Sequence, residues 1–126
     1  MSLRTPLNSV LGLGSAKDGT SHFWSQRVSG IALALLGSWF AFCMATLPGF
    51  SHVDAITFIS LPLNNILLLL LSVTIAYHSY LGVQVVLEDY VYGHGLKLAS
   101  LIASRFVHSL LAVAAIYATL KIGFSG

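Results

Sequence analysis

One histidine of this sequence, His78, stands in the middle of a long apolar run, within the segment Tyr77-His78-Ser79-Tyr80. A polar side chain costs free energy in such a run, so it invites a functional hypothesis. An imidazole at this depth can form a structural hydrogen bond, relay a proton, or donate a nitrogen to a haem iron. Gly82 follows one helical turn later and leaves space for a flat macrocycle. The residues alone leave all three roles open.

A carboxylate and a phenol, Asp89 and Tyr90, come at the end of the same run. On a regular helix Asp89 shares a narrow stripe with His78 and Gly82, so we expect this stripe to face protein or a cofactor. Tyr90 points about 120° away from His78, and tyrosines at such positions commonly anchor a membrane interface. A phenol beside a carboxylate can also hydrogen-bond and protonate a quinone carbonyl.

Arg27 is a cation at the head of the first apolar run. Its side chain can either reach the lipid phosphates or pair with a buried anion such as a haem propionate. His22 lies in the polar segment just before it, where a solvated or capping role is the simpler interpretation.

Arg105 and His108 lie one turn apart in the third apolar run. From its depth alone, we expect Arg105 to neutralise Glu88 or Asp89 across the helix pair. His108 is the nearest candidate for a second histidine at the depth of His78, but its position does not match convincingly. A second axial ligand of an iron would therefore come from a partner chain.

Three apolar runs must position these residues in a bilayer. Hydrophobic residues make up 56% of the 126 residues and charged residues only 8%, against about a quarter in soluble domains. We therefore predict an all-α membrane protein with one domain, residues 1–126, and three transmembrane helices. The predicted spans are residues 28–47, 66–87 and 98–122, each to within a few positions.

The polar segments complete this prediction. Residues 1–26 are expected to form an N-terminal arm outside the membrane, with Thr20 or Ser21 capping the first helix. A short polar link with His52 and Asp54 is expected after the first span.

The positions of Lys and Arg predict the orientation. Arg4, Lys17 and Arg27 precede or open the first span, the link after this span has no cation, and the next link has Lys97. The positive-inside rule then places the N-terminus on the cytoplasmic or matrix side.

Small residues on two of the spans indicate helix partners. One row lies on the first span and another on the third, and small residues let helices approach closely in lipid. We therefore expect packing against helices of another chain. The single cysteine, Cys43, excludes an internal disulfide and a cysteine-based metal site. A net charge of +2 without a basic stripe gives no indication of nucleic-acid binding.

Taken together, these residues make the sequence resemble one protein family. The segment His78-Ser79-Tyr80-Leu81-Gly82, followed by Glu88-Asp89-Tyr90, resembles the His-x-x-x-Gly-x6-Asp-Tyr signature of the small haem-anchoring subunit of succinate dehydrogenase. The stretch from Gly14 to Arg27 looks like the pre-helix segment of that family, in which a Gly-rich turn leads to an arginine at the head of the first span. Length, three spans and orientation agree with the family over nearly the whole chain.

The resemblance implies cofactors and partners. The chain would anchor a flavoprotein subunit with FAD and an iron–sulfur subunit, next to a second three-helix cytochrome b anchor. His78 would be an axial ligand of haem b, with Arg27 and His22 as partners of its propionates. Tyr90, with Asp89 beside it, would hydrogen-bond ubiquinone. The chain would not be catalytic alone, but in the complex electrons from succinate, an intermediate of the tricarboxylic acid cycle, would pass to ubiquinone in the respiratory chain.

Two other functions share this topology. One is the anchor of a fumarate reductase, which runs the opposite reaction with menaquinone, although His78 argues against the haem-free anchors of that kind. The other is a structural or assembly subunit without a cofactor. For either of them, as for the succinate dehydrogenase anchor, we expect a multi-pass protein of the bacterial inner membrane, with the mitochondrial inner membrane as the alternative.

Overall fold

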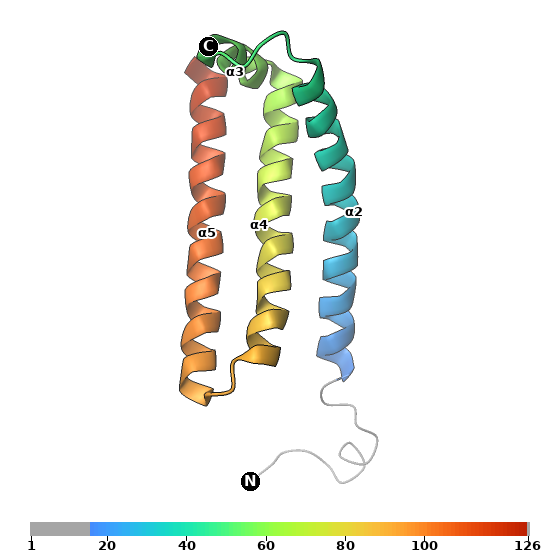
Figure 1. Cartoon of the computed structure of the whole chain (residues 1–126), viewed down its shortest axis with the longest axis vertical. Coiled ribbons are helices and arrows are strands. Elements are labelled where there is room, and N and C mark those ends of the chain that lie inside the picture. The colour runs from blue at the N-terminus through green and yellow to red at the C-terminus, as the bar shows by residue number, and fades with distance from the viewer. Residues whose placement is uncertain (1–15, 126) are drawn as a thin grey trace.

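The computed structural model describes residues 16–125, which form four helices. In chain order these are α2 (Ala16–Thr46), α3 (His52–Ser60), α4 (Pro62–Tyr90) and α5 (His94–Ser125). Three of them are long and run side by side, and the short α3 lies across one end (Figure 1). The described residues contain no strand, so the all-α prediction is confirmed.

The three long helices are suited to cross a bilayer. The apolar stretches that qualify are Thr20–Thr46, Pro62–Tyr90 and His94–Ser125. The shortest has 27 residues and is therefore about 40 Å long, against about 30 Å for a hydrocarbon core. Among the described residues only Ser29, Leu71 and Leu81 are buried. An apolar surface exposed to this extent fits lipid and partner helices, and the prediction of three spanning helices is confirmed.

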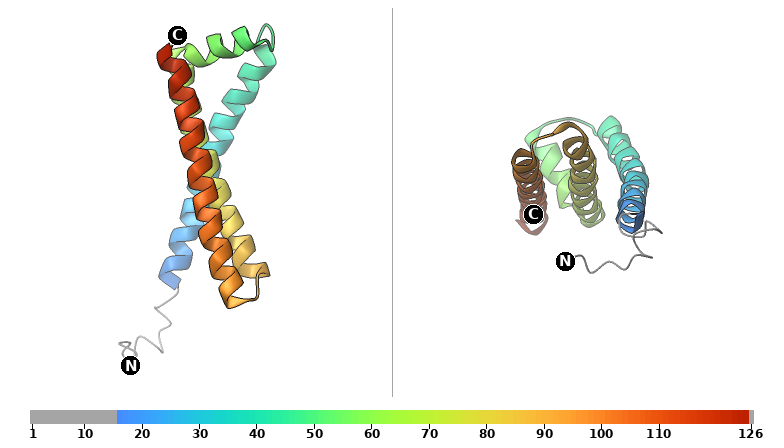
Figure 2. Two further views of the ribbon diagram at one scale, coloured as in Figure 1. Left: turned by 90° about the vertical axis from the view of Figure 1, so that its left-hand side faces the viewer. Right: turned by 90° about the horizontal axis from the view of Figure 1, so that it is seen from below.

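The long helices form a single layer with α4 in the middle. Within the described part of the chain, α4 packs against α2 on one side and α5 on the other, whereas α2 and α5 do not pack against each other. Seen from the end, the three helices lie in a shallow arc (Figure 2). The side view shows that α2 crosses α4 and α5 obliquely (Figure 2). Both faces of the layer are therefore open to other helices or to lipid.

Helix α2 begins earlier than the sequence suggested. It starts at Ala16, so Thr20 and Ser21 lie inside the helix and the prediction that they cap it is wrong. The physical reason is that a spanning helix can continue past the hydrocarbon core into the headgroup region, so the end of an apolar run does not mark the end of the helix. Residues 1–15 of the predicted arm, with Arg4 and Gly14, lie outside the described residues.

The link between α2 and α4 contains a helix that the sequence analysis missed. Ser51 caps α3: its hydroxyl oxygen accepts from the backbone N–H of Asp54 at 3.2 Å, and the Asp54 carboxylate accepts from the Ser51 N–H at 3.0 Å. This reciprocal arrangement is a capping box. The expected polar link is thus an ordered helix lying across the ends of the spans.

Two asparagines join the ends of α3, α4 and α5. Asn64 donates to the backbone oxygen of Phe58 at 3.0 Å. Asn65 donates to the backbone oxygens of Ile59 at 3.1 Å and Thr119 at 2.8 Å. The last carbonyls of a helix have no partner within it, so these amides satisfy the end of α3 and fix α5 beside it. Helix α4 begins at Pro62, since proline is well tolerated in the first turn of a helix. Both asparagines therefore lie near the start of this helix.

Candidate functional site

A line of polar side chains runs along the contact between α2 and α4. It consists of His22, Gln26 and Ser29 on α2 and His78 on α4, and we call these four residues the polar seam. The three residues of α2 are spaced by four and three positions, which places them on one face of the helix. Only 7% of Ser29 is exposed, so the seam is shielded where the two helices meet.

The imidazole of His78 is held by Ser29. Its Nδ1 lies 3.0 Å from the Oγ of Ser29, and this Oγ lies 3.2 Å from the backbone oxygen of Gln26. A carbonyl oxygen can only accept, so the single hydroxyl proton of Ser29 is directed to Gln26. The Ser29 oxygen then accepts from the Nδ1–H of His78. In a neutral imidazole this leaves Nε2 without a proton, which is the form that binds a metal.

Two glycines border this contact. A Cβ atom on Gly30 would lie 3.3 Å from Cε1 of His78, tighter than an ordinary van der Waals contact. A Cβ atom on Gly82 would lie 3.7 Å from Nε2 of Gln26. Gly30 therefore lets the imidazole rest against the backbone of α2, whereas a Cβ on Gly82 would make an ordinary van der Waals contact with Gln26.

Two polar atoms in the seam have no hydrogen-bond partner on the described residues. They are Nε2 of His22 and Oε1 of Gln26, and both atoms are buried. Buried polar atoms are normally paired, so each unpaired one needs an explanation such as an absent ligand. The interpretation of His22 as a solvated or capping residue is wrong, because α2 begins at Ala16 and the Nε2 of His22 is buried.

Arg27 lies beside the seam but outside it. Its side chain is exposed and its guanidinium lies over the ring of Phe23, 4.9 Å from the centroid. Such a cation–π contact leaves the N–H donors at the guanidinium edge available to an anion.

Asp89 and Tyr90 lie at the end of α4, away from the seam. Both are exposed, and Tyr90 keeps 74% of its surface. They follow His78 by eleven and twelve residues, so they lie about 16 to 18 Å further along the helix axis. The structure therefore separates the predicted quinone residues from the predicted iron ligand, and both Asp89 and Tyr90 are free to contact another chain.

The expected pairing of Arg105 is wrong. Within the described residues its guanidinium forms no ion pair with Glu88 or Asp89 and instead lies over the ring of Tyr80, 5.8 Å from the centroid. Glu88 accepts a hydrogen bond from Gln84 of its own helix at 2.8 Å. The two acidic residues lie in the last turn of α4, whereas Arg105 lies beside Tyr80, more than two turns earlier.

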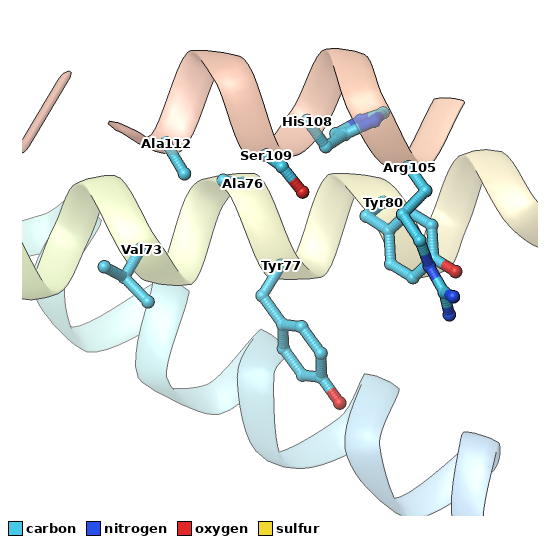
Figure 3. A pocket seen from close by; sticks show the side chains of 8 residues that line it. All are labelled: Val73, Ala76, Tyr77, Tyr80, Arg105, His108, Ser109 and Ala112. Carbon is cyan, nitrogen blue, oxygen red and sulfur yellow. The ribbon is translucent and has the colours of Figure 1, made fainter. Parts of the chain in front are cut away.

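His108 lies on the opposite side of α4 from the seam. Its ring contacts Tyr80 edge-on, with centroids 5.9 Å apart, and its Nδ1–H donates to the backbone oxygen of Ser104 at 2.7 Å. Figure 3 shows His108 and Tyr80 together between α4 and α5. Because α4 lies between them, His78 and His108 do not face each other.

Sequence reasoning missed Ser29 and Gln26. Serine and glutamine are common residues without a characteristic motif, and the bond from Ser29 to His78 joins positions 49 residues apart. One signal was available: on a helix extended backwards from Arg27, His22, Gln26 and Ser29 share one face.

The chain matches known proteins over most of its length. Residues 1–120 match the model of a family described as succinate dehydrogenase/fumarate reductase transmembrane subunit. A succinate dehydrogenase hydrophobic membrane anchor subunit from Paracoccus denitrificans is 30% identical over 119 residues, covering 94% of this chain and 92% of the relative. A protein of the same description from Rickettsia typhi is 38% identical over 105 residues, covering 82% of this chain and 83% of the relative.

Proposed function

This chain belongs to the succinate dehydrogenase/fumarate reductase transmembrane subunit family, among the succinate dehydrogenase hydrophobic membrane anchor subunits, and we propose that it holds haem b and helps to form a ubiquinone-reduction site. The observation that carries the proposal is the contact of His78 with Ser29, which engages Nδ1 of a mid-span histidine and leaves Nε2 as the nitrogen for an iron. Haem b, when bound, provides an iron that changes oxidation state by one electron. The chain itself binds, orients and shields it.

The polar seam fits a haem in two respects. His78 supplies an imidazole of fixed orientation, and the seam holds buried polar atoms that a haem could pair. Within residues 16–125, Nε2 of His22 is a buried nitrogen without a partner, and His22 lies seven residues from Ser29, about 10 Å along α2. His22 is thus a candidate to hydrogen-bond a propionate at the end of the seam, with Arg27 as the nearby cation.

A second ligand of the haem iron would come from a partner chain. His108 is the other histidine at comparable depth, and α4 separates it from His78. The open faces of the layer offer surface to a second anchor subunit. A flavoprotein subunit with FAD and an iron–sulfur subunit would bind on the cytoplasmic or matrix side, where the positive-inside rule puts the N-terminus and the turn between α4 and α5.

Tyr90 and Asp89 are the proposed quinone residues. Both side chains are exposed at the end of α4, on that same side of the membrane. The Tyr90 hydroxyl can donate a hydrogen bond to a carbonyl of ubiquinone, and Asp89 can accept a hydrogen bond or deliver a proton. A bacterial inner membrane fits this orientation.

A reduced-minus-oxidised visible spectrum of the purified complex tests the haem assignment. We expect a low-spin b-type spectrum from the wild type and from His52→Ala, a control at the exposed start of α3. In His78→Ala the haem content is expected to fall about tenfold or more, since second-shell groups alone change metal affinity by 10- to 100-fold. Unchanged haem in His78→Ala would exclude it as the ligand. A wild-type complex without haem would contradict the haem proposal, and the chain would then be a haem-free anchor.

A further inference from the structure

An arginine on α5 lies at membrane depth. Arg105 follows Lys97 by eight residues, so it lies about 12 Å further along the helix axis. Lys97 marks the turn between α4 and α5, where its Nζ donates to the backbone oxygen of Glu88 at 2.6 Å. Around Arg105, α5 exposes apolar side chains such as Ile102 and Phe106. The cation therefore belongs to a stretch that faces lipid or partner helices.

This guanidinium has no anionic partner on the described residues. Its contact is the face of Tyr80, 5.8 Å from the ring centroid. A guanidinium carries five N–H donors, and a cation–π contact offsets only part of the cost of removing it from water. An anion from outside this chain would satisfy these donors.

Two hollows between α4 and α5 meet at Tyr80 and Arg105. The inner hollow, of about 310 Å³, extends toward the middle of the spans, where Ala76 and Ala112 line it (Figure 3). The outer hollow, of about 490 Å³, extends toward the start of α5, where Leu98 lines it. We call the two hollows together the α4–α5 furrow. It has a cation between its halves and apolar walls toward the bilayer centre.

We propose that the α4–α5 furrow binds an anionic phospholipid, with the phosphodiester at Arg105 and one acyl chain in the inner hollow. Arginine pairs with phosphate through two parallel N–H···O bonds, and its long side chain can reach from membrane depth toward the headgroup level. The outer hollow opens toward that level, which Lys97 marks, and the inner hollow leads to the hydrocarbon. A zwitterionic lipid carries its own cation and neutralises less of the charge of Arg105. The proposal goes beyond haem and quinone binding and does not depend on either.

Native mass spectrometry of the intact detergent-purified complex tests this site. The complex is delipidated and equilibrated with dioleoylphosphatidylglycerol or dioleoylphosphatidylcholine. We expect the wild type to retain one more phosphatidylglycerol than Arg105→Gln, with an apparent affinity at that site roughly tenfold higher, as for one charge-assisted hydrogen-bonded pair. Lys121→Gln, which removes an exposed cation at the far end of α5, should match the wild type, and Arg105→Lys should retain part of the binding.

Three results would overturn the proposal. One is equal phosphatidylglycerol retention by Arg105→Gln, and another is equal retention of phosphatidylcholine by the wild type. The third is loss of the second anchor subunit from the Arg105→Gln complex, which would assign the guanidinium to a protein carboxylate. The haem spectrum of Arg105→Gln is expected to be unchanged, so failure of this site is distinguishable from failure of the His78 assignment.

Discussion

Nδ1 of His78 lies 3.0 Å from Oγ of Ser29, and this contact joins the middle of two spanning helices. The Ser29 hydroxyl also contacts the Gln26 carbonyl at 3.2 Å, and both contacts are satisfied when the imidazole is the donor. The bond therefore fixes the rotation of the ring. Imidazoles that bind metals are commonly oriented in this way by a group on their other nitrogen.

Ser29→Ala should change the haem without removing it. Losing the hydrogen bond makes His78 a weaker electron donor, so we expect the midpoint potential to rise by some tens of millivolts, on the order of what second-shell groups contribute. Redox titration of the purified complex measures this shift. Ser38→Ala is the matched control, because the Ser38 hydroxyl bonds only to its own helix at Ala34. Equal potentials in the two variants would contradict the role of Ser29.

Gly30→Ala should displace the imidazole of His78. The added Cβ would lie 3.3 Å from Cε1 of His78, so the ring or the helix must move by a few tenths of an ångström. Gly37→Ala on the same helix meets nothing within 4 Å and should be neutral or stabilising by up to about 1 kcal/mol, the gain of alanine in a helix. Haem content and thermal stability of the two variants are compared. The idea fails if Gly30→Ala behaves like Gly37→Ala in both.

Tyr90→Phe should slow quinone reduction while leaving the haem spectrum intact. The substitution removes only the hydroxyl, which is the group proposed to bind a quinone carbonyl, and a decrease of roughly tenfold or more in kcat/KM is expected for a proton donor. Tyr92→Phe is the control, since Tyr92 is 90% exposed two residues later. Succinate-dependent quinone reduction by the whole complex is the measurement. Wild-type turnover in Tyr90→Phe would remove Tyr90 from the quinone site.

Gly123→Ala should weaken the end of the layer near α3. Its Cβ would lie 2.5 Å from Nδ2 of Asn65, so Asn65 must move away from the carbonyls of Ile59 and Thr119. Losing such bonds costs about 1–3 kcal/mol when the groups stay unpaired. Gly95→Ala, at the other end of α5, meets nothing within 4 Å and serves as the control. We expect only Gly123→Ala to lower the thermal midpoint of the complex, and equal midpoints would argue against the Asn65 contact.

The capping box of α3 should respond to pH. Hydrogen bonds from the Ser51 hydroxyl and then the Ser51 N–H hold the pKa of Asp54 below its ordinary value of 3.8. Because the folded pKa is depressed, the box stabilises α3 above pH 3.8, and this contribution is lost as the pH falls through the folded pKa. Carboxyl NMR titration should give a pKa closer to 3.8 in Ser51→Ala. The same pKa in both proteins would contradict the assigned cause.

The sequence was informative where it contained long patterns. Three apolar runs predicted the spanning helices, and the segment from His78 to Tyr90 carried the family resemblance that the comparisons confirm. Such patterns predict structure reliably because hydropathy and helical period depend on many neighbouring residues at once.

Long-range contacts were not predictable in this way. The partner of Arg105 depended on how far α4 and α5 are offset along their axes, and depth alone suggested Glu88 or Asp89 instead of Tyr80. The role of Ser29 depended on the crossing of α2 over α4. The α3 helix was missed because its nine residues are too few for a reliable period, and its capping box from Ser51 to Asp54 was the available signal.

The absence of packing between α2 and α5 in the described residues has a consequence for biogenesis. Helix α2 meets α4 along one oblique crossing, and that crossing contains unpaired polar atoms of His22 and Gln26. Outside that crossing, the contact that holds α2 is the stacking of Trp39 on Phe58 of the short helix α3, with ring centroids 6.2 Å apart. The subunit should therefore reach its final geometry only on assembly, and an excess copy in the membrane should be a preferred substrate for proteolytic quality control.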